Sequence, residues 1–183
     1  MKKTRILVTL TGIRPLIFDR YPGDNNTKLP TVDKMYLNSN RGLIIPAINL
    51  FSLLAAENTK SVCRQFFGKT GKTVALGIAS FVSIEPFEIP ILGVNGEPIV
   101  FDKFGGQIVV RKDVARMAKG IPNPKERPQI NLPWSLDFEL QYIDNDQCSI
   151  GNLQMAVSRG GILGLGTFRP YFGRYDLTKW SIE

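Results

Sequence analysis

The chain has 183 residues, of which 43% are hydrophobic and 21% charged, a balance typical of one globular domain with a sizeable core. With 23 Lys and Arg against 16 Asp and Glu, the formal net charge is +7, which favours a polyanionic partner. The sequence has no histidine and two isolated cysteines, Cys63 and Cys148. This composition excludes imidazole catalysis, histidine-ligated metals and a disulfide framework.

The hydrophobic pattern predicts no membrane segment. No stretch approaches the roughly 20 apolar residues of a membrane span. The apolar run after the N-terminus is interrupted by Thr9, Thr11 and Gly12, unlike a signal peptide. We therefore expect a cytoplasmic protein with no membrane partner, no metal and no cofactor.

The first part of the chain predicts a strand, a long loop, two helices and a second strand. Ile6, Val8 and Leu10 alternate with polar residues, which indicates a strand with one buried face. Pro46 suits the first position of a helix. The expected elements are a strand over 4–10, a loop over 19–40, helices over 46–56 and 60–67, and a central strand over 73–84.

Residues 85–133 read as an insertion. Asn95-Gly96 is a strong hairpin-turn signal between the apolar stretches 89–94 and 98–101. The following segment, 111–133, is basic and contains four prolines, which rule out a continuous helix. We expect a flexible arm there, with a solvated surface loop as the alternative. Its candidate RNA contacts are Arg111, Lys112, Arg116 and Lys119.

The last part of the chain predicts strand, helix, strand. Residues 134–142 alternate cleanly between apolar and polar side chains, and Ser149 is suited to cap a helix over 150–159. A last strand is expected over 171–180. The order of elements predicts an α+β, ferredoxin-like (RRM-like) βαββαβ core, built from 1–84 and 134–183, with 85–133 as an inserted β-hairpin and basic arm. Such a sheet is the scaffold of RNA-recognition modules.

The stretch 159–175 holds five glycines, three arginines and four aromatic residues. Glycines let a backbone approach a ligand closely, arginines bind phosphate, and aromatic rings stack on unpaired bases. The alternative is a tight turn with core aromatics and solvated arginines. The predicted RNA contacts are Arg14, Arg41, Arg159, Arg169 and Arg174 for phosphate, the backbone at Gly164 and Gly166, and Phe168 and Tyr171 for stacking.

Two other motifs carry less weight. The segment 68–73, Gly-Lys-Thr-Gly-Lys-Thr, lacks the first P-loop glycine because Phe66 stands there, and we expect a helix before it and a strand after it, the reverse of a P-loop. Asp24 is a candidate catalytic carboxylate for RNA cleavage. It has no second ligand cluster, and beside Gly23 it suits a turn. We expect no enzymatic activity.

Three segments together resemble the RAMP superfamily, in particular the CRISPR-associated backbone subunits that polymerise along a guide RNA. They are Gly12-Ile13-Arg14-Pro15-Leu16, Gly42-Leu43-Ile44-Ile45-Pro46-Ala47-Ile48-Asn49-Leu50, and Gly164-Leu165-Gly166 with Gly173-Arg174-Tyr175. The second departs from the family pattern, which usually has serines after the proline. The endonuclease branch of the superfamily commonly uses histidine, which this chain lacks.

The resemblance implies a non-catalytic RNA-binding subunit of an antiviral CRISPR ribonucleoprotein. Its implied partners are single-stranded RNA, copies of itself and other effector-complex subunits. The alternative is a stand-alone or phage-type structural or inhibitory protein that keeps the fold but does not bind RNA.

Overall fold

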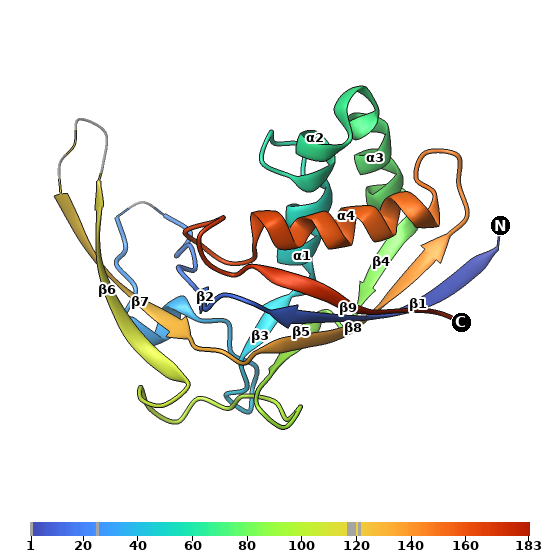
Figure 1. Cartoon of the computed structure of the whole chain (residues 1–183). Coiled ribbons are helices and arrows are strands. Elements are labelled where there is room, and N and C mark those ends of the chain that lie inside the picture. Colours follow the sequence, from blue (N-terminus) through green and yellow to red (C-terminus); the bar gives the residue numbers. More distant parts are fainter. Residues whose placement is uncertain (1, 25, 117–119, 121) are drawn as a thin grey trace.

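The computed structural model describes residues 2–24, 26–116, 120 and 122–183, with the backbone alone for residues 115 and 116 (Figure 1). Of the predicted arm contacts, Lys119 lies outside the described residues, and only the backbone of Arg116 is described.

The larger sheet has the strand order β3-β5-β8-β1-β9, and β4 also pairs with β8. Every pairing in it is antiparallel, and the longest runs from Lys3 opposite Ile143 to Thr11 opposite Ser135. Its strands are β1 (Lys3–Gly12), β3 (Ile44–Pro46), β4 (Val82–Glu85), β5 (Glu88–Leu92), β8 (Ser135–Ile143) and β9 (Tyr175–Ile182).

The helices cover one face of this sheet and leave the other face open (Figure 1). They are α1 (Ala47–Ala55), α2 (Val62–Phe66), α3 (Gly71–Phe81) and α4 (Ile150–Leu163). The alternation of Ile6, Val8 and Leu10 with polar residues puts these three side chains under the helices, where each is 0–2% exposed. Burial of such side chains drives the two layers together.

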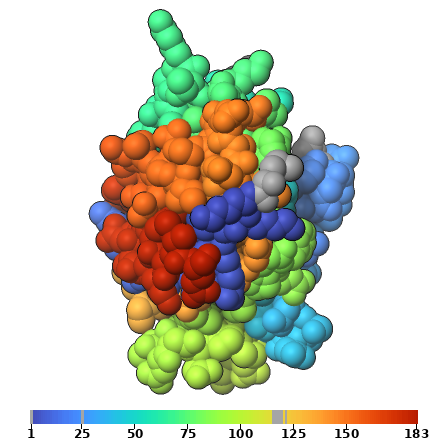
Figure 2. All heavy atoms as spheres, turned by 90° about the vertical axis from the view of Figure 1, so that its right-hand side faces the viewer, coloured from blue at the N-terminus to red at the C-terminus, as the bar shows by residue number. Residues whose placement is uncertain are grey.

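The ferredoxin-like fold is confirmed. Strand β1, the helices α1–α3, strands β4 and β8, helix α4 and strand β9 follow one another along the chain. In space their strands lie in the order β9-β1-β8-β4, with the last strand beside the first. Because β1 and β9 pair antiparallel, the first residues of β1 and the last residues of β9 lie together at one end of the molecule (Figure 2).

Residues 85–133 divide between two sheets. Strand β5 pairs with the same edge of β8 as β4 does, so residues 88–92 extend the main sheet. Residues 108–116 and 122–130 form β6 (Ile108–Arg116) and β7 (Pro122–Ile130), which build a second sheet of order β2-β7-β6 together with β2 (Leu16–Ile17). Strands β6 and β7 form a long hairpin that projects away from the helices (Figure 1).

The described residues of the expected flexible arm thus form two regular paired strands, and neither an arm nor a loop without strands was the right expectation for them. The prolines of β7, Pro122, Pro124 and Pro128, occupy alternate positions. Backbone N–H groups alternate between the two edges of a strand, so the missing donors fall on one edge. The other edge remains complete and pairs with β6 from Ile108 to Arg116.

Two further predictions need correction. Residues 73–84 are not one strand, because α3 runs to Phe81 and only then does β4 begin. Val74 and Ile78 are buried four residues apart, which is a helical spacing. A helix thus follows the P-loop-like segment, although α2 rather than a strand precedes it.

Helix α4 begins as predicted. The hydroxyl of Ser149 accepts a hydrogen bond from the backbone N–H of Asn152 at 3.1 Å. The helix continues beyond the predicted end at residue 159 and includes Gly160 and Gly161. Among the described residues, no helix has both the length and the apolar character that a membrane crossing requires.

Candidate nucleic-acid interface

The residues 164–174, here called the glycine loop, connect α4 to β9 and fold back onto β2 and the segment between β1 and β2. The N–H of Gly173 donates to the carbonyl of Pro15 at 2.8 Å, and the N–H of Thr167 donates to that of Ile17 at 2.9 Å. The N–H of Ile13 donates to the carbonyl of Arg174 at 2.8 Å. Two of the three family-like segments are therefore held together by backbone hydrogen bonds.

A close approach within the glycine loop itself explains the glycine at position 173. Its φ is +68°, and a Cβ there would lie 2.0 Å from the carbonyl oxygen of Leu165. Gly164 does not offer the expected phosphate donor, because its N–H donates to the carbonyl of Gly160 at 2.8 Å. Gly166 is exposed, so its backbone remains a candidate contact.

Three arginines from three different elements lie over three aromatic rings of the glycine loop. The guanidinium carbon of Arg14 is 5.7 Å from the ring centre of Tyr171. The corresponding distances are 4.8 Å for Arg111 and Phe172, and 4.5 Å for Arg127 and Phe168. We call these six residues the arginine–aromatic cluster. Each contact is within the range of a cation–π interaction.

The members of the cluster differ in exposure. Tyr171 is 70% exposed and Arg14 is also exposed, so this ring and this cation can meet a ligand directly. Phe172 is buried and belongs to the core. Arg169, one of the predicted phosphate contacts, is exposed and lies two positions before Tyr171 in sequence.

The two hairpin arginines are each held by a carboxylate. The Nε of Arg127 donates to Asp19 at 2.7 Å, and the Nε of Arg111 donates to Asp113 at 2.8 Å. Of the predicted arm contacts, Arg111 thus joins the cluster. Lys112 instead pairs with Glu126 at 3.1 Å and is exposed.

Two predicted contacts lie outside the cluster. Arg41 donates through Nε to the carbonyl of Phe101 at 2.9 Å and lies over that ring, on the side of the molecule that holds β3. Arg159 lies on α4 over the ring of Phe66. It shares a surface hollow of about 410 Å³ with Arg174, so these two arginines are neighbours at one side of the glycine loop.

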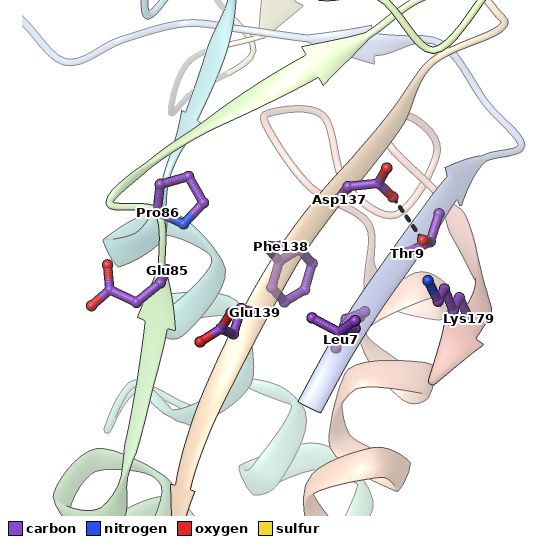
Figure 3. A pocket seen from close by; sticks show the side chains of 9 residues that line it. Leu7, Thr9, Glu85, Pro86, Asp137, Phe138, Glu139 and Lys179 are labelled. Atoms are coloured by element: carbon purple, nitrogen blue, oxygen red, sulfur yellow. Dashed lines mark hydrogen bonds between the residues drawn. The ribbon is translucent and has the colours of Figure 1, made fainter. Parts of the chain in front are cut away.

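The open face of the main sheet does not look like an RNA-stacking surface. A shallow hollow of about 460 Å³ there is lined by Glu85, Asp137 and Glu139, with Lys179 opposite them (Figure 3). The hydroxyl of Thr9 donates to Asp137 at 2.6 Å across the strands (Figure 3). Among the described residues of β1, β8 and β9, none is an exposed aromatic. Exposed arginines and aromatic rings gather at the glycine loop instead.

The surroundings of Asp24 are those of a turn. Its carboxylate accepts hydrogen bonds from the backbone N–H groups of Asn26 and Thr27 at 2.7 Å and from the Thr27 hydroxyl at 2.6 Å. The Thr27 hydroxyl and then the two N–H groups lower the pKa of Asp24. In the described part of the chain, no group of three His, Cys, Asp or Glu residues could hold a metal ion.

The sequence prediction missed Arg127 and Asp19 as partners. Arg127 was considered only as one of several basic residues in the arm, and Asp19 only, together with Asp24, as a loop carboxylate for RNA cleavage. They are 108 positions apart in sequence, and only the pairing of β2 with β7 brings them together.

No protein-family model and no curated protein matches the sequence. Chains of solved structures do match in fold. One is a chain in the cryo-EM structure of the type III-B Cmr-β bound to cognate target RNA, with a TM-score of 0.64 and 15% identity. The alignment covers 99% of this chain and 61% of that chain, so the present chain spans about three fifths of the matched one.

Proposed function

We propose that the chain is a non-catalytic RNA-binding subunit of a CRISPR-type ribonucleoprotein. It holds single-stranded RNA, such as a guide RNA, next to copies of itself and other subunits, in the cytoplasm. The arginine–aromatic cluster on the glycine loop carries this proposal. It combines an exposed cation, Arg14, with two exposed rings, Tyr171 and Phe168, at one place on a chain of net charge +7.

The cluster suggests how RNA is held. The two exposed cations, Arg14 and Arg169, contact phosphates, and Tyr171 stacks on one base, an interaction that tolerates any sequence. Arg159 and Arg174 extend the positive surface along the loop towards α4. Since binding of each phosphate releases counterions, the affinity falls steeply with salt.

The fold comparison supports the same assignment. The matched Cmr-β chain comes from a complex bound to target RNA, and its fold resembles this one over 99% of the present chain. The resemblance of three segments to the RAMP superfamily agrees with this structural likeness.

A matched pair of charge reversals tests the proposal. Arg14→Glu with Arg169→Glu changes two exposed cations of the interface, and Lys69→Glu with Lys72→Glu makes the same change in net charge at the start of α3. Fluorescence anisotropy with a labelled oligouridylate measures the affinity. We expect the first double variant to lose at least about tenfold in affinity and the second to retain it. Equal losses in both would reject the glycine loop as the interface.

The absence of catalysis is tested separately. Labelled RNA incubated with the protein and Mg²⁺ or Mn²⁺ should stay intact on a denaturing gel. Cleavage that disappears in Asp24→Asn while binding persists would overturn the non-catalytic assignment and make Asp24 the catalytic residue.

A further inference from the structure

Arg127 is a buried cation whose hydrogen bonding is incomplete. Its side chain is 8% exposed, and its Nε is paired with Asp19 at 2.7 Å. Its Nη1 is buried and has no hydrogen-bond partner among the described residues. A buried donor on a charged group without an acceptor is unfavourable. This nitrogen is therefore suited to donate a hydrogen bond to a ligand oxygen.

Phe168 packs against this guanidinium. Its ring centre is 4.5 Å from the guanidinium carbon, and the residue is 39% exposed, whereas Arg127 is buried. Phe168 has a φ of 58°, which is uncommon for a residue other than glycine. A partly exposed ring in contact with a buried guanidinium is a candidate for a movable cover.

A second cation lies directly across the hairpin. Arg111 on β6 is opposite Arg127 on β7 in the strand register. Like charges in this position repel each other. Each has one carboxylate partner, Asp19 for Arg127 and Asp113 for Arg111. An anion that enters beside Phe168 therefore meets two guanidinium groups, and the side chain of Arg111 is already 38% exposed.

We propose that Arg127 is a concealed phosphate contact of the RNA interface and that Phe168 is its displaceable lid. This inference rests on the proposed RNA-binding function. When RNA crosses the glycine loop, the ring of Phe168 moves aside and Nη1 donates to a non-bridging oxygen of one phosphodiester. Phosphate is the acceptor that guanidinium groups contact most readily on nucleic acids.

The salt dependence of binding tests the phosphate contact. For single strands, each neutralised phosphate makes the slope of log affinity against log salt more negative by about 0.7. Anisotropy titrations with a labelled oligouridylate at several salt concentrations give this slope for the wild type and for Arg127→Met. The control is Arg5→Met, which removes an arginine paired with Glu139 and Glu183 on the open sheet face.

We expect the fall of log affinity with log salt to be less steep by about 0.7 for Arg127→Met and unchanged for Arg5→Met. A structural role alone would lower the fraction of active protein and leave the slope as it is. An unchanged slope in Arg127→Met would thus overturn this inference, whereas a wild type that does not bind RNA would overturn the proposed function.

Phe168→Ala tests the lid and keeps Arg127 in place if Arg127→Met does not fold. A lid costs free energy to displace, so the variant should bind RNA more tightly at every salt concentration with the wild-type slope. Weaker binding would show that the ring is a stacking platform for a base and would overturn the lid.

Discussion

Two glycines of α4 show how close packing fixes the site at the scale of single residues. A Cβ at Gly161 would lie 2.0 Å from the backbone oxygen of Tyr175, at the start of β9. A Cβ at Gly151 would meet only the hydroxyl of Ser149, at 3.8 Å. Helix α4 can approach β9 this closely only with glycine at 161, and this contact positions the glycine loop that follows.

Gly161→Ala should therefore lower the free energy of unfolding by about 1–3 kcal/mol, because the backbone of β9 cannot yield without distortion. Gly151→Ala, in the same helix, should be neutral or stabilising by up to about 0.5 kcal/mol. Urea unfolding followed by circular dichroism measures both. Equal stability of the two variants would contradict the close packing of α4 on β9.

The two thiols give a pH-dependent prediction. Burial raises the pKa of Cys63 to about 12 and that of Cys148 to about 11, both from 9.0. The folded state holds these protons more tightly than the unfolded state. Their contribution to stability is thus complete below pH 9 and is lost as the pH rises towards 11 and 12.

Native protein at a pH of about 8 should react with a thiol reagent only as fast as it unfolds, and protein in guanidinium chloride should react at once. Unfolding free energies measured from a pH of about 8 to about 11 should decrease. Rapid labelling of the native protein would contradict the burial of these cysteines.

At the residue scale, sequence analysis singled out residues of the arginine–aromatic cluster but did not predict which of them contact each other. Arg14 and Tyr171 were predicted as contacts because of their residue types, and the structure brings them together. Arg127 was not predicted, because its role depends on Asp19 and Phe168, which only the tertiary fold places beside it.

At the scale of secondary-structure elements, the open face of the main sheet offers a test of where RNA binds. In a stacking module of the RRM type this face carries the aromatic residues. Here it carries Asp137 and Glu139, and the rings lie at the glycine loop.

Asp137→Asn with Glu139→Gln should change RNA affinity by less than about twofold at physiological salt, because charges farther away than about 8 Å are largely screened. Anisotropy at about 0.15 M salt measures this. A gain of tenfold or more would show that these carboxylates repel RNA at close range and would place RNA on the sheet face.

The accuracy of element prediction followed the clarity of the hydrophobic pattern. Strand β8 and helix α4 were predicted because alternation and a serine cap are local signals. The sequence predicted a strand over 73–84, where most residues belong to helix α3, because a short apolar run fits either structure. The β6–β7 hairpin was missed because prolines on one edge of a strand resemble a loop in sequence.

At the scale of the whole molecule, the order of elements was sufficient to predict the ferredoxin-like fold, because few topologies satisfy a βαββαβ order with short connections. The stretch 159–175 was predicted from its composition to contact RNA, but its neighbours in the fold were not predicted. In the proposed interface the glycine loop meets β2 and the hairpin, and these three segments are far apart in sequence.

The most direct test of the account is the nucleic acid content of the purified protein. The ratio of absorbance at 260 nm to that at 280 nm should be measured across a sizing column, before and after ribonuclease treatment. We predict a large, RNA-rich particle that ribonuclease converts to a smaller one, and no such particle for Arg14→Glu with Arg169→Glu. A nucleic-acid-free peak that ribonuclease leaves unchanged would contradict RNA binding and favour an interaction protein that keeps this fold without RNA.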